Sequence, residues 1–247
     1  MARSSCSSRP RSDGGGPAAR RTAAGAGALL FLVACGAQAA PAGGEVRGSI
    51  AVEMAAVRAS GAKDDLDVVL LLEPVSGKPA APVAARAEMD QKGLVFLPHV
   101  LAVQRGTTVT FLNNDPEPHN VYFLDDRTGK TLDIGTYGPG VSVDHTFTEP
   151  GMVIVLCKLH LEMAAYVVVS GWPWFTAVRL DPGTSTASFR IAGVPPGEYE
   201  LRAWHKSLKQ KGGAVRVRVA GGSVVEVPVV ITKARYARAA GSPGAGK

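Results

Sequence analysis

Cysteine is scarce in this chain, with three residues among 247. Cys6 and Cys35 lie within the first 39 residues, so Cys157 has no partner in the rest of the chain. A disulfide framework is therefore excluded. An unpaired thiol in an exported protein is prone to oxidation unless something occupies it, and a bound metal ion does so.

Long hydrophobic runs are missing as well, because the apolar stretch Ala28–Ala34 is too short to span a bilayer as a helix. It follows scattered arginines and precedes small residues at 37–39, which is the three-part pattern of a signal peptide over residues 1–39. We expect this leader to direct export to the periplasm and to be cut. Two cut sites compete: 37–39 suits ordinary signal peptidase, whereas 32–35 resembles a lipoprotein box that would make Cys35 a lipid anchor.

A large excess of charge of one sign is also absent once the leader is set aside. Residues 40–247 hold 22 basic and 20 acidic residues, a net charge of about +2. Lysine and arginine form no cluster interleaved with aromatic residues outside residues 233–247. The composition therefore disfavours nucleic acid as a partner. We interpret residues 233–247 as a flexible basic tail.

Helical periodicity is absent after Glu45, where apolar runs of four to eight residues alternate with glycine, proline, asparagine and aspartate. This pattern predicts an all-β chain. Ten short predicted strands fit a Greek-key sandwich, for which we expect a domain over residues 45–170. The apolar run Met152–Leu156 predicts a strand that is buried on both faces and ends next to Cys157.

A second β module follows the interruption at 171–174. Five further strands are predicted over residues 175–232, the last of them over residues 224–231, and Pro-Gly and Gly-Gly turns separate them. A module of about 60 residues is only marginally stable alone, so we expect it to pack against the first.

Four donor side chains stand in two short segments. Cys157, His160 and Met163 follow one another with two residues in each gap, and His119 lies 38 residues before Cys157. One thiolate, two imidazoles and one thioether are the ligand set of a blue-copper electron-transfer site. Three donors come from one predicted loop between strands and His119 from a loop at the same edge. Such a site should change little between Cu(I) and Cu(II), as fast electron transfer requires.

Zinc is the competing metal, since it also accepts cysteine and histidine. A structural zinc site usually completes its tetrahedron with cysteine, histidine or a carboxylate rather than methionine, and copper ranks above zinc in divalent affinity. Taken singly, each donor has an ordinary interpretation as a loop histidine, a core methionine or a buried thiol. The joint spacing favours one type 1 copper ion.

Further motifs carry a resemblance to a known family. They are Phe96-Leu97-Pro98, Gly106 to Phe111, Asn114-Asp115, His119-Asn120-Val121, Thr146-Phe147, Pro150-Gly151 and the segment of Cys157, His160 and Met163. From about Glu88 to Val169 the chain resembles the cupredoxins, and its short gap before Met163 is similar to that of amicyanin rather than plastocyanin. Two alanines follow Met163 where many cupredoxins have glycine, a departure in the ligand loop.

The resemblance implies roles for individual residues. His119, Cys157, His160 and Met163 would hold the copper ion, and Asn120 would tie the two ligand loops together near the sulfur. The whole chain also resembles periplasmic proteins labelled methylamine-utilisation or plastocyanin-like. In these the second part is similar to a carboxypeptidase regulatory-like, transthyretin-type sandwich, which by itself implies no reaction partner.

The remaining histidines fall outside this donor set. His99 lies between two predicted strands, His145 shares a predicted strand face with Phe147, and His205 follows Trp204. Because the site already has its four ligands, we interpret all three as structural or exposed residues.

Two functions share these ligands. The first is a periplasmic carrier of single electrons that docks briefly with redox proteins through His160 and an apolar rim of Pro118, Leu159 and Leu161. The second is an envelope protein that stores or delivers copper without shuttling electrons. An enzyme is disfavoured, because five histidines are too few for a multicopper oxidase and no second cysteine lies near Cys157 for a dinuclear site.

Overall fold

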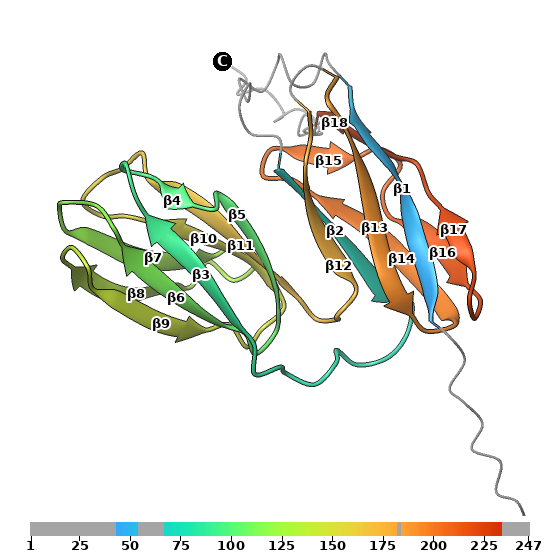
Figure 1. Ribbon diagram of the computed structural model, residues 1–247, viewed down its shortest axis with the longest axis horizontal. Coiled ribbons are helices and arrows are strands. Elements are labelled where there is room, and N and C mark those ends of the chain that lie inside the picture. Colours follow the sequence, from blue (N-terminus) through green and yellow to red (C-terminus); the bar gives the residue numbers. More distant parts are fainter. Residues whose placement is uncertain (1–42, 54–66, 182–183, 234–247) are drawn as a thin grey trace, which may run out of the picture. The chain divides into compact units, whose positions relative to one another are not determined.

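The structure is a computed structural model that describes residues 43–53, 67–181 and 184–233. The predicted signal peptide, Cys35 and all of the predicted tail except Lys233 lie outside these residues. Every regular element in the described ranges is a β-strand, which confirms the all-β prediction (Figure 1). In the part of the chain that is described, no helix is long and apolar enough to cross a membrane.

Strands β3 to β11 form a sandwich of two sheets, called here the β3–β11 sandwich (Figure 1). The four-stranded sheet has the order β4-β3-β6-β9, and the five-stranded sheet has the order β5-β11-β10-β7-β8. The strands are β3 (Arg86–Gln91), β4 (Phe96–Leu97), β5 (Val100–Gln104), β6 (Thr108–Asn113), β7 (His119–Asp125), β8 (Thr131–Tyr137), β9 (Ser142–Thr146), β10 (Gly151–Leu156) and β11 (Ala164–Ser170).

The core of this sandwich forms from side chains at alternate strand positions. In β6 the side chains of Val109, Phe111 and Asn113 are buried and those between them are partly exposed, which is the period of two expected for a strand. Phe111 packs against Phe123 with ring centroids 5.3 Å apart. Cys157 belongs to the same buried cluster, so its sulfur is held by close-packed neighbours.

Strand β8 has no counterpart among the predicted strands, because Asp133 and Gly135 interrupt its apolar pattern. Gly135 has a φ of 113°, which favours glycine, and it lies at a bulge in the pairing of β7 with β8. The carboxylate of Asp133 accepts a hydrogen bond of 2.9 Å from the N–H of Gly135. The bulge is a feature of the pairing between β7 and β8, so the local sequence of β8 does not reveal it.

Strand β10 is less buried than predicted. Val155 is fully buried, but Met152, Val153 and Ile154 are all partly exposed. The prediction that this strand is buried on both faces is therefore wrong. Val153 and Val155 face the sandwich core, while the alternate residues lie on the other face of the sheet, which is only partly covered.

A nine-stranded sheet accompanies the sandwich. Its order is β12-β2-β14-β15-β18-β1-β13, with β16 beside β14 and β17 beside β1. The strands are β1 (Gly44–Val52), β2 (Asp67–Pro74), β12 (Phe175–Arg179), β13 (Thr186–Val194), β14 (Gly197–Trp204), β15 (Leu208–Gln210), β16 (Val215–Val219), β17 (Val224–Glu226) and β18 (Val229–Lys233).

The pairing of β1 and β2 differs from the expectation of one domain over residues 45–170. Strand β1 pairs with β13, β17 and β18, and β2 pairs with β12 and β14. Their side chains at Val46, Ile50, Leu70 and Leu72 are buried in the core of the nine-stranded sheet. Local periodicity identifies a strand but not its partners, which is why the sequence pattern placed these strands with the following ones.

Candidate metal centre

The predicted donors come from two loops at one end of the β3–β11 sandwich. His119 opens β7, Cys157 directly follows β10, and Met163 directly precedes β11. Strand β10 lies between β7 and β11, so the pairing of three strands brings these positions together. The connection between β10 and β11 is a tight loop, since Cys157 N donates to Met163 O over 3.3 Å and Met163 N donates to His160 O over 3.1 Å.

Three of the donor atoms converge on a common point. His119 Nδ1 and His160 Nδ1 are 3.0 Å apart, and Cys157 Sγ lies 3.7 Å from His160 Nδ1. The ligand atoms of all three residues fall within 4.8 Å of one another. Imidazole and thiolate ligands typically lie about 2.0–2.3 Å from a metal ion, so an ion between these atoms fits their separations.

Met163, the fourth predicted ligand, is buried in the same core cluster as Cys157. Its backbone carbonyl accepts a hydrogen bond from Cys157 N, so the two residues are adjacent in the backbone of the loop. Its role as a weak axial ligand stays a prediction.

Asn120 connects the two ligand loops. Its backbone N–H donates to Cys157 Sγ over 3.4 Å, and its side-chain Oδ1 accepts from Lys158 N over 3.4 Å. The amide Nδ2 donates to Asp133 Oδ1 over 2.9 Å. Hydrogen bonds from Lys158, Asn120 and Gly135 lower the pKa of Asp133 to about 2, so its carboxylate is charged at neutral pH.

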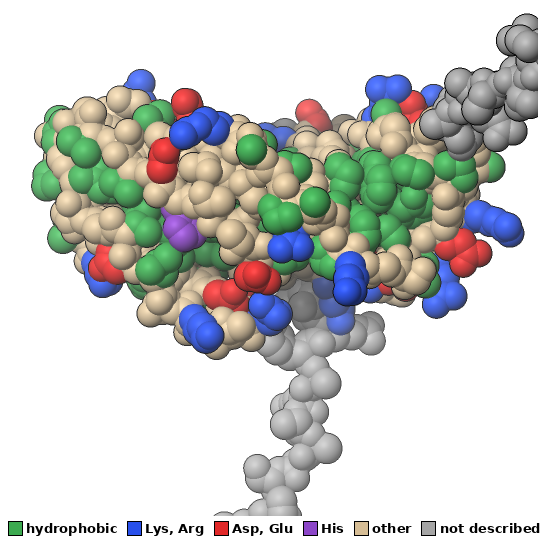
Figure 2. Space-filling view, turned by 90° about the horizontal axis from the view of Figure 1, so that it is seen from below, with side chains coloured by type: hydrophobic (Ala, Val, Ile, Leu, Met, Phe, Trp, Pro, Cys, Tyr) green, Lys and Arg blue, Asp and Glu red, His purple; other side chains and the backbone are tan. Residues whose placement is uncertain are grey.

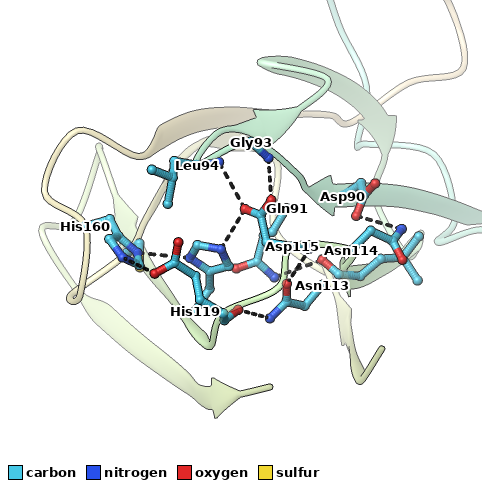
Figure 3. A network of polar contacts seen from close by, with 12 residues as sticks. Asp90, Gln91, Gly93, Leu94, Asn113, Asn114, Asp115, His119 and His160 are labelled. Atoms are coloured by element: carbon cyan, nitrogen blue, oxygen red, sulfur yellow. Dashed lines mark hydrogen bonds and ion pairs between the residues drawn. The ribbon is translucent and has the colours of Figure 1, made fainter. Parts of the chain in front are cut away.

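Asp115 is the residue of this site that sequence reasoning did not assign a role. Its carboxylate is buried, and its Oδ2 lies 2.8 Å from Nε2 of His119, on the opposite side of that ring from Nδ1 (Figure 3). It also accepts hydrogen bonds from Gly93 N at 2.5 Å and Leu94 N at 3.0 Å. Burial acts to raise the pKa of Asp115, but the hydrogen bonds it accepts outweigh burial and hold the pKa below its ordinary value.

The available sequence signal for Asp115 is its spacing of four residues before His119 in the loop between β6 and β7. The sequence places it near the ligand but does not indicate which way its side chain points.

Buried amide side chains are hydrogen-bonded to the loop that carries His119. Asn113 Nδ2 donates to Glu117 O at 3.0 Å and to Tyr137 O at 3.1 Å, and its Oδ1 accepts from Asp115 N at 3.0 Å. Gln91 Nε2 donates to the Tyr137 hydroxyl at 2.8 Å. Burial raises the pKa of Tyr137 to about 12, so this phenol remains neutral. The loop is therefore held by hydrogen bonds as well as by packing, although the buried Oε1 of Gln91 finds no hydrogen-bond partner among the described residues.

His160 is the most exposed of the predicted ligands. Its side chain is 21% exposed, whereas that of His119 is fully buried. The exposed Leu159 and Leu161 flank it in the chain, the latter with 87% of its surface exposed, and the exposed Pro118 precedes the other ligand, His119. Glu117 Oε2 lies 3.5 Å from His160 Nε2. The site thus meets the surface at one imidazole edge beside apolar side chains.

The other histidines lie away from the three converging donors. His99 is partly buried and contacts Tyr166 edge to face, with ring centroids 5.4 Å apart. His145 packs against Phe147 at 4.8 Å. The buried His205 accepts hydrogen bonds at its Nδ1 from the two backbone N–H groups of residues 207 and 208. These surroundings agree with the structural roles expected for them.

Known proteins resemble this chain over the β3–β11 sandwich. The model of the family described as copper binding proteins, plastocyanin/azurin family, matches residues 83–170. A chloroplastic plastocyanin of Physcomitrium patens is 38% identical over 117 residues, which cover 42% of this chain and 70% of the relative. Plastocyanin A'/A'' of Nicotiana tabacum is 32% identical over 80 residues, which cover 29% of this chain and 81% of the relative.

Solved structures give similar matches. A reduced mutant form of amicyanin is 29% identical, with 41% of this chain and 98% of the amicyanin covered and a TM-score of 0.33. A copper-containing nitrite reductase of Thermus scotoductus is 27% identical, with 39% of this chain and 25% of that chain covered and a TM-score of 0.32.

The residues matched by the family model contain the whole β3–β11 sandwich and all four predicted ligands. The likeness of the second part to a carboxypeptidase regulatory-like module stays a prediction. From its identity to the plastocyanins over most of their length, this chain belongs to the copper-binding plastocyanin/azurin family, the cupredoxins, whose cofactor is copper and whose members transfer electrons.

Proposed function

We propose that this chain is a periplasmic carrier of single electrons, in which one type 1 copper ion held by His119, Cys157, His160 and Met163 cycles between Cu(I) and Cu(II). The observation that carries the proposal is the convergence of one thiolate and two imidazoles within 4.8 Å. This donor set, with Met163 in the same buried cluster as Cys157, matches the chemistry of a blue-copper centre.

The bound copper supplies the one-electron couple, and the residues of the chain keep its surroundings constant. The N–H of Asn120 points at the sulfur of Cys157 and stabilises the negative charge of the thiolate. The same residue fixes the backbone of Lys158, so both ligand loops are joined. A site anchored on paired strands and buried amides needs little rearrangement when its charge changes.

The exposed edge of His160 is the proposed route for the electron. Pro118, Leu159 and Leu161 give it an apolar rim, and weak redox encounters use small interfaces of this kind. On the face shown in Figure 2, charged side chains of both signs lie among hydrophobic ones. The described part of this face carries no uniformly basic surface of the kind that binds a polyanion.

Export to the periplasm rests on the predicted leader over residues 1–39. Soluble processing at residues 37–39 and a lipid anchor at Cys35 predict different mature N-termini. The mass of the mature protein distinguishes them, because acylation at Cys35 adds the mass of the lipid.

Voltammetry of the copper-loaded chain tests the function. A carrier should be reduced and reoxidised reversibly with its copper retained, because both oxidation states are bound by the same donors. A protein that stores or delivers copper should instead release the ion on reduction. Release of copper in the first cycle would contradict the electron-carrier proposal.

Cys157→Ser tests the metal site itself. We expect this variant to lose the intense visible absorption, because a serine oxygen cannot supply the thiolate-to-copper transition. As a control, His99→Gln should remain blue, since His99 packs against Tyr166 away from the donors. A blue Cys157→Ser protein would remove Cys157 from the site.

A further inference from the structure

The buried carboxylate of Asp115 stands directly behind one predicted copper ligand. Its Oδ2 is 2.8 Å from His119 Nε2, while His119 Nδ1 faces the common point of the donors. The two nitrogens of one imidazole ring therefore point to a carboxylate on one side and to the metal position on the other (Figure 3). His119 is fully buried and Asp115 is 6% exposed, so solvent screens this contact little.

The other partners of Asp115 determine which atom carries the proton. Gly93 N and Leu94 N both donate to this carboxylate, one to each oxygen. With N–H donors on both oxygens, the carboxylate acts as an acceptor only, so His119 must donate through Nε2–H. The Nδ1 lone pair is then left for a metal ion, which is the tautomer that a copper ligand requires.

Asp115 is itself held in place before any ion binds. Its backbone N–H donates to Asn113 Oδ1, and the Asn113 amide donates to the backbone carbonyls of Glu117 and Tyr137. This network fixes the backbone of Asp115, and the N–H groups of Gly93 and Leu94 hold its carboxylate, so the carboxylate turns away only if both of those bonds break. A carboxylate fixed in this way orients the ring and increases the electron donation of Nδ1.

From this arrangement we infer that Asp115 is a positioning residue of the copper centre, whose negative charge acts through His119 to stabilise Cu(II) over Cu(I). This inference rests on the proposed function. Its consequence is a lower reduction potential than the four ligands alone would give, because an anion close to the ion favours the more highly charged state. The chain would then suit electron partners of low potential.

The simpler alternative is that Asp115 only ties the 93–94 turn to the His119 loop. Such a structural role would change the stability of the protein and leave the preference for Cu(II) over Cu(I) untouched. The reduction potential separates the two roles, since it reports the ratio of the affinities for the two ions.

The test compares Asp115→Asn with Asp144→Asn in the copper-loaded full chain. We expect Asp115→Asn to weaken Cu(II) binding at least tenfold relative to Cu(I), which raises the potential by at least about 59 mV. Asp144 is an exposed carboxylate on β9 that pairs with Arg86, so its loss removes the same charge without touching a donor. The control should keep the wild-type potential.

A measurement on the wild-type protein covers the case in which Asp115→Asn does not fold. In the diamagnetic Cu(I) form, nuclear magnetic resonance should show the Nε2 of His119 protonated, with a proton that exchanges slowly with water. An unprotonated Nε2 or a rapidly exchanging proton would overturn the inference, as would a folded Asp115→Asn with the wild-type potential. A wild-type protein without a reversible copper couple would instead contradict the proposed function.

Discussion

Met163 is the weakest of the four predicted donors. Its replacement should therefore change the reduction potential without loss of the copper ion. We expect Met163→Leu to keep its copper and to raise the reduction potential by roughly 60 mV, a tenfold change in the affinity ratio, because Cu(II) loses more than Cu(I) when a donor is removed. Voltammetry and metal analysis measure both quantities.

Met89 offers a matched control, because it is a fully buried methionine of the same core. Met89→Leu should leave the potential unchanged. Loss of all copper from Met163→Leu would show that the thioether is a principal ligand rather than an axial one.

His205 gives the protein a pH-dependent stability that does not involve the metal site. Burial lowers the pKa of His205 to about 4, so the folded protein keeps this imidazole neutral while the unfolded chain protonates it near its ordinary value of 6.5. The stabilisation is fully present above about pH 6.5 and is lost as the pH falls towards 4. It amounts to roughly 2–3 kcal/mol.

His205→Asn isolates this effect. An asparagine Oδ1 can accept the two backbone hydrogen bonds that Nδ1 of His205 accepts, and it does not titrate. Between pH 6.5 and 4, urea unfolding should therefore show a smaller loss of stability for the variant than for the wild type. Equal losses would assign the acid sensitivity to other groups.

At the residue scale, side-chain chemistry and spacing predicted more than side-chain direction. The types of Cys157, His160 and Met163 and their gaps of two residues were enough to indicate copper. Asp115 was visible as a motif residue, but its contact with His119 depends on the loop that carries Gly93 and Leu94. That loop lies between β3 and β4, and no local sequence pattern indicates that it contacts Asp115.

At the scale of elements, the turn between β5 and β6 depends on a single residue, Gly106. Its φ of 89° favours glycine, and an added Cβ would lie 2.6 Å from both the N and the O of Val83. We expect Gly106→Ala to lower the free energy of unfolding by about 2 kcal/mol or more, from backbone strain and steric overlap together. Chemical denaturation measures the loss.

Gly138 provides the matched control for this substitution. It has no positive φ, and no heavy atom lies within 4 Å of an added Cβ. Gly138→Ala should change the stability by no more than about 0.5 kcal/mol. Similar losses in the two variants would rule out the crowding at Gly106 as the cause.

Strand existence was easier to predict than strand boundaries. Apolar runs identified most strands, but β8 and β15 were not predicted, and one run expected over residues 224–231 is two strands, β17 and β18. Pro228 lies between them and has no N–H to donate to a neighbouring strand. A strand that contains or adjoins proline, glycine or aspartate forms because a neighbouring strand pairs with it. The local sequence does not reveal that pairing.

At the scale of the molecule, the two largest buried clusters of the described residues can be tested separately with two probes. All three tryptophans lie outside the β3–β11 sandwich, at residues 172, 174 and 204, whereas the predicted copper donors lie within it or at its strand ends. Ile50 is fully buried in the core of the nine-stranded sheet. Ile50→Ala should destabilise that sheet by about 2–5 kcal/mol.

The expected result is a lower thermal midpoint in tryptophan fluorescence with little change in the midpoint of the blue colour. Phe111→Ala, in the other core, is the converse control and should lower the midpoint of the colour. A common shift of both signals in both variants would show that the two cores unfold as one unit.

The sequence by itself determined the chemistry of this protein: an all-β chain, a donor set that selects copper, and the family that uses it. These follow from residue type and short-range spacing, which persist in any conformation. Tertiary structure alone decided that β1 and β2 belong to the nine-stranded sheet and that β8 pairs with β7, the strand that begins with His119. It also decided that the carboxylate of Asp115 contacts Nε2 of His119. Each depends on contacts between segments far apart in the chain, and such contacts are set by the packing of the whole core rather than by local pattern.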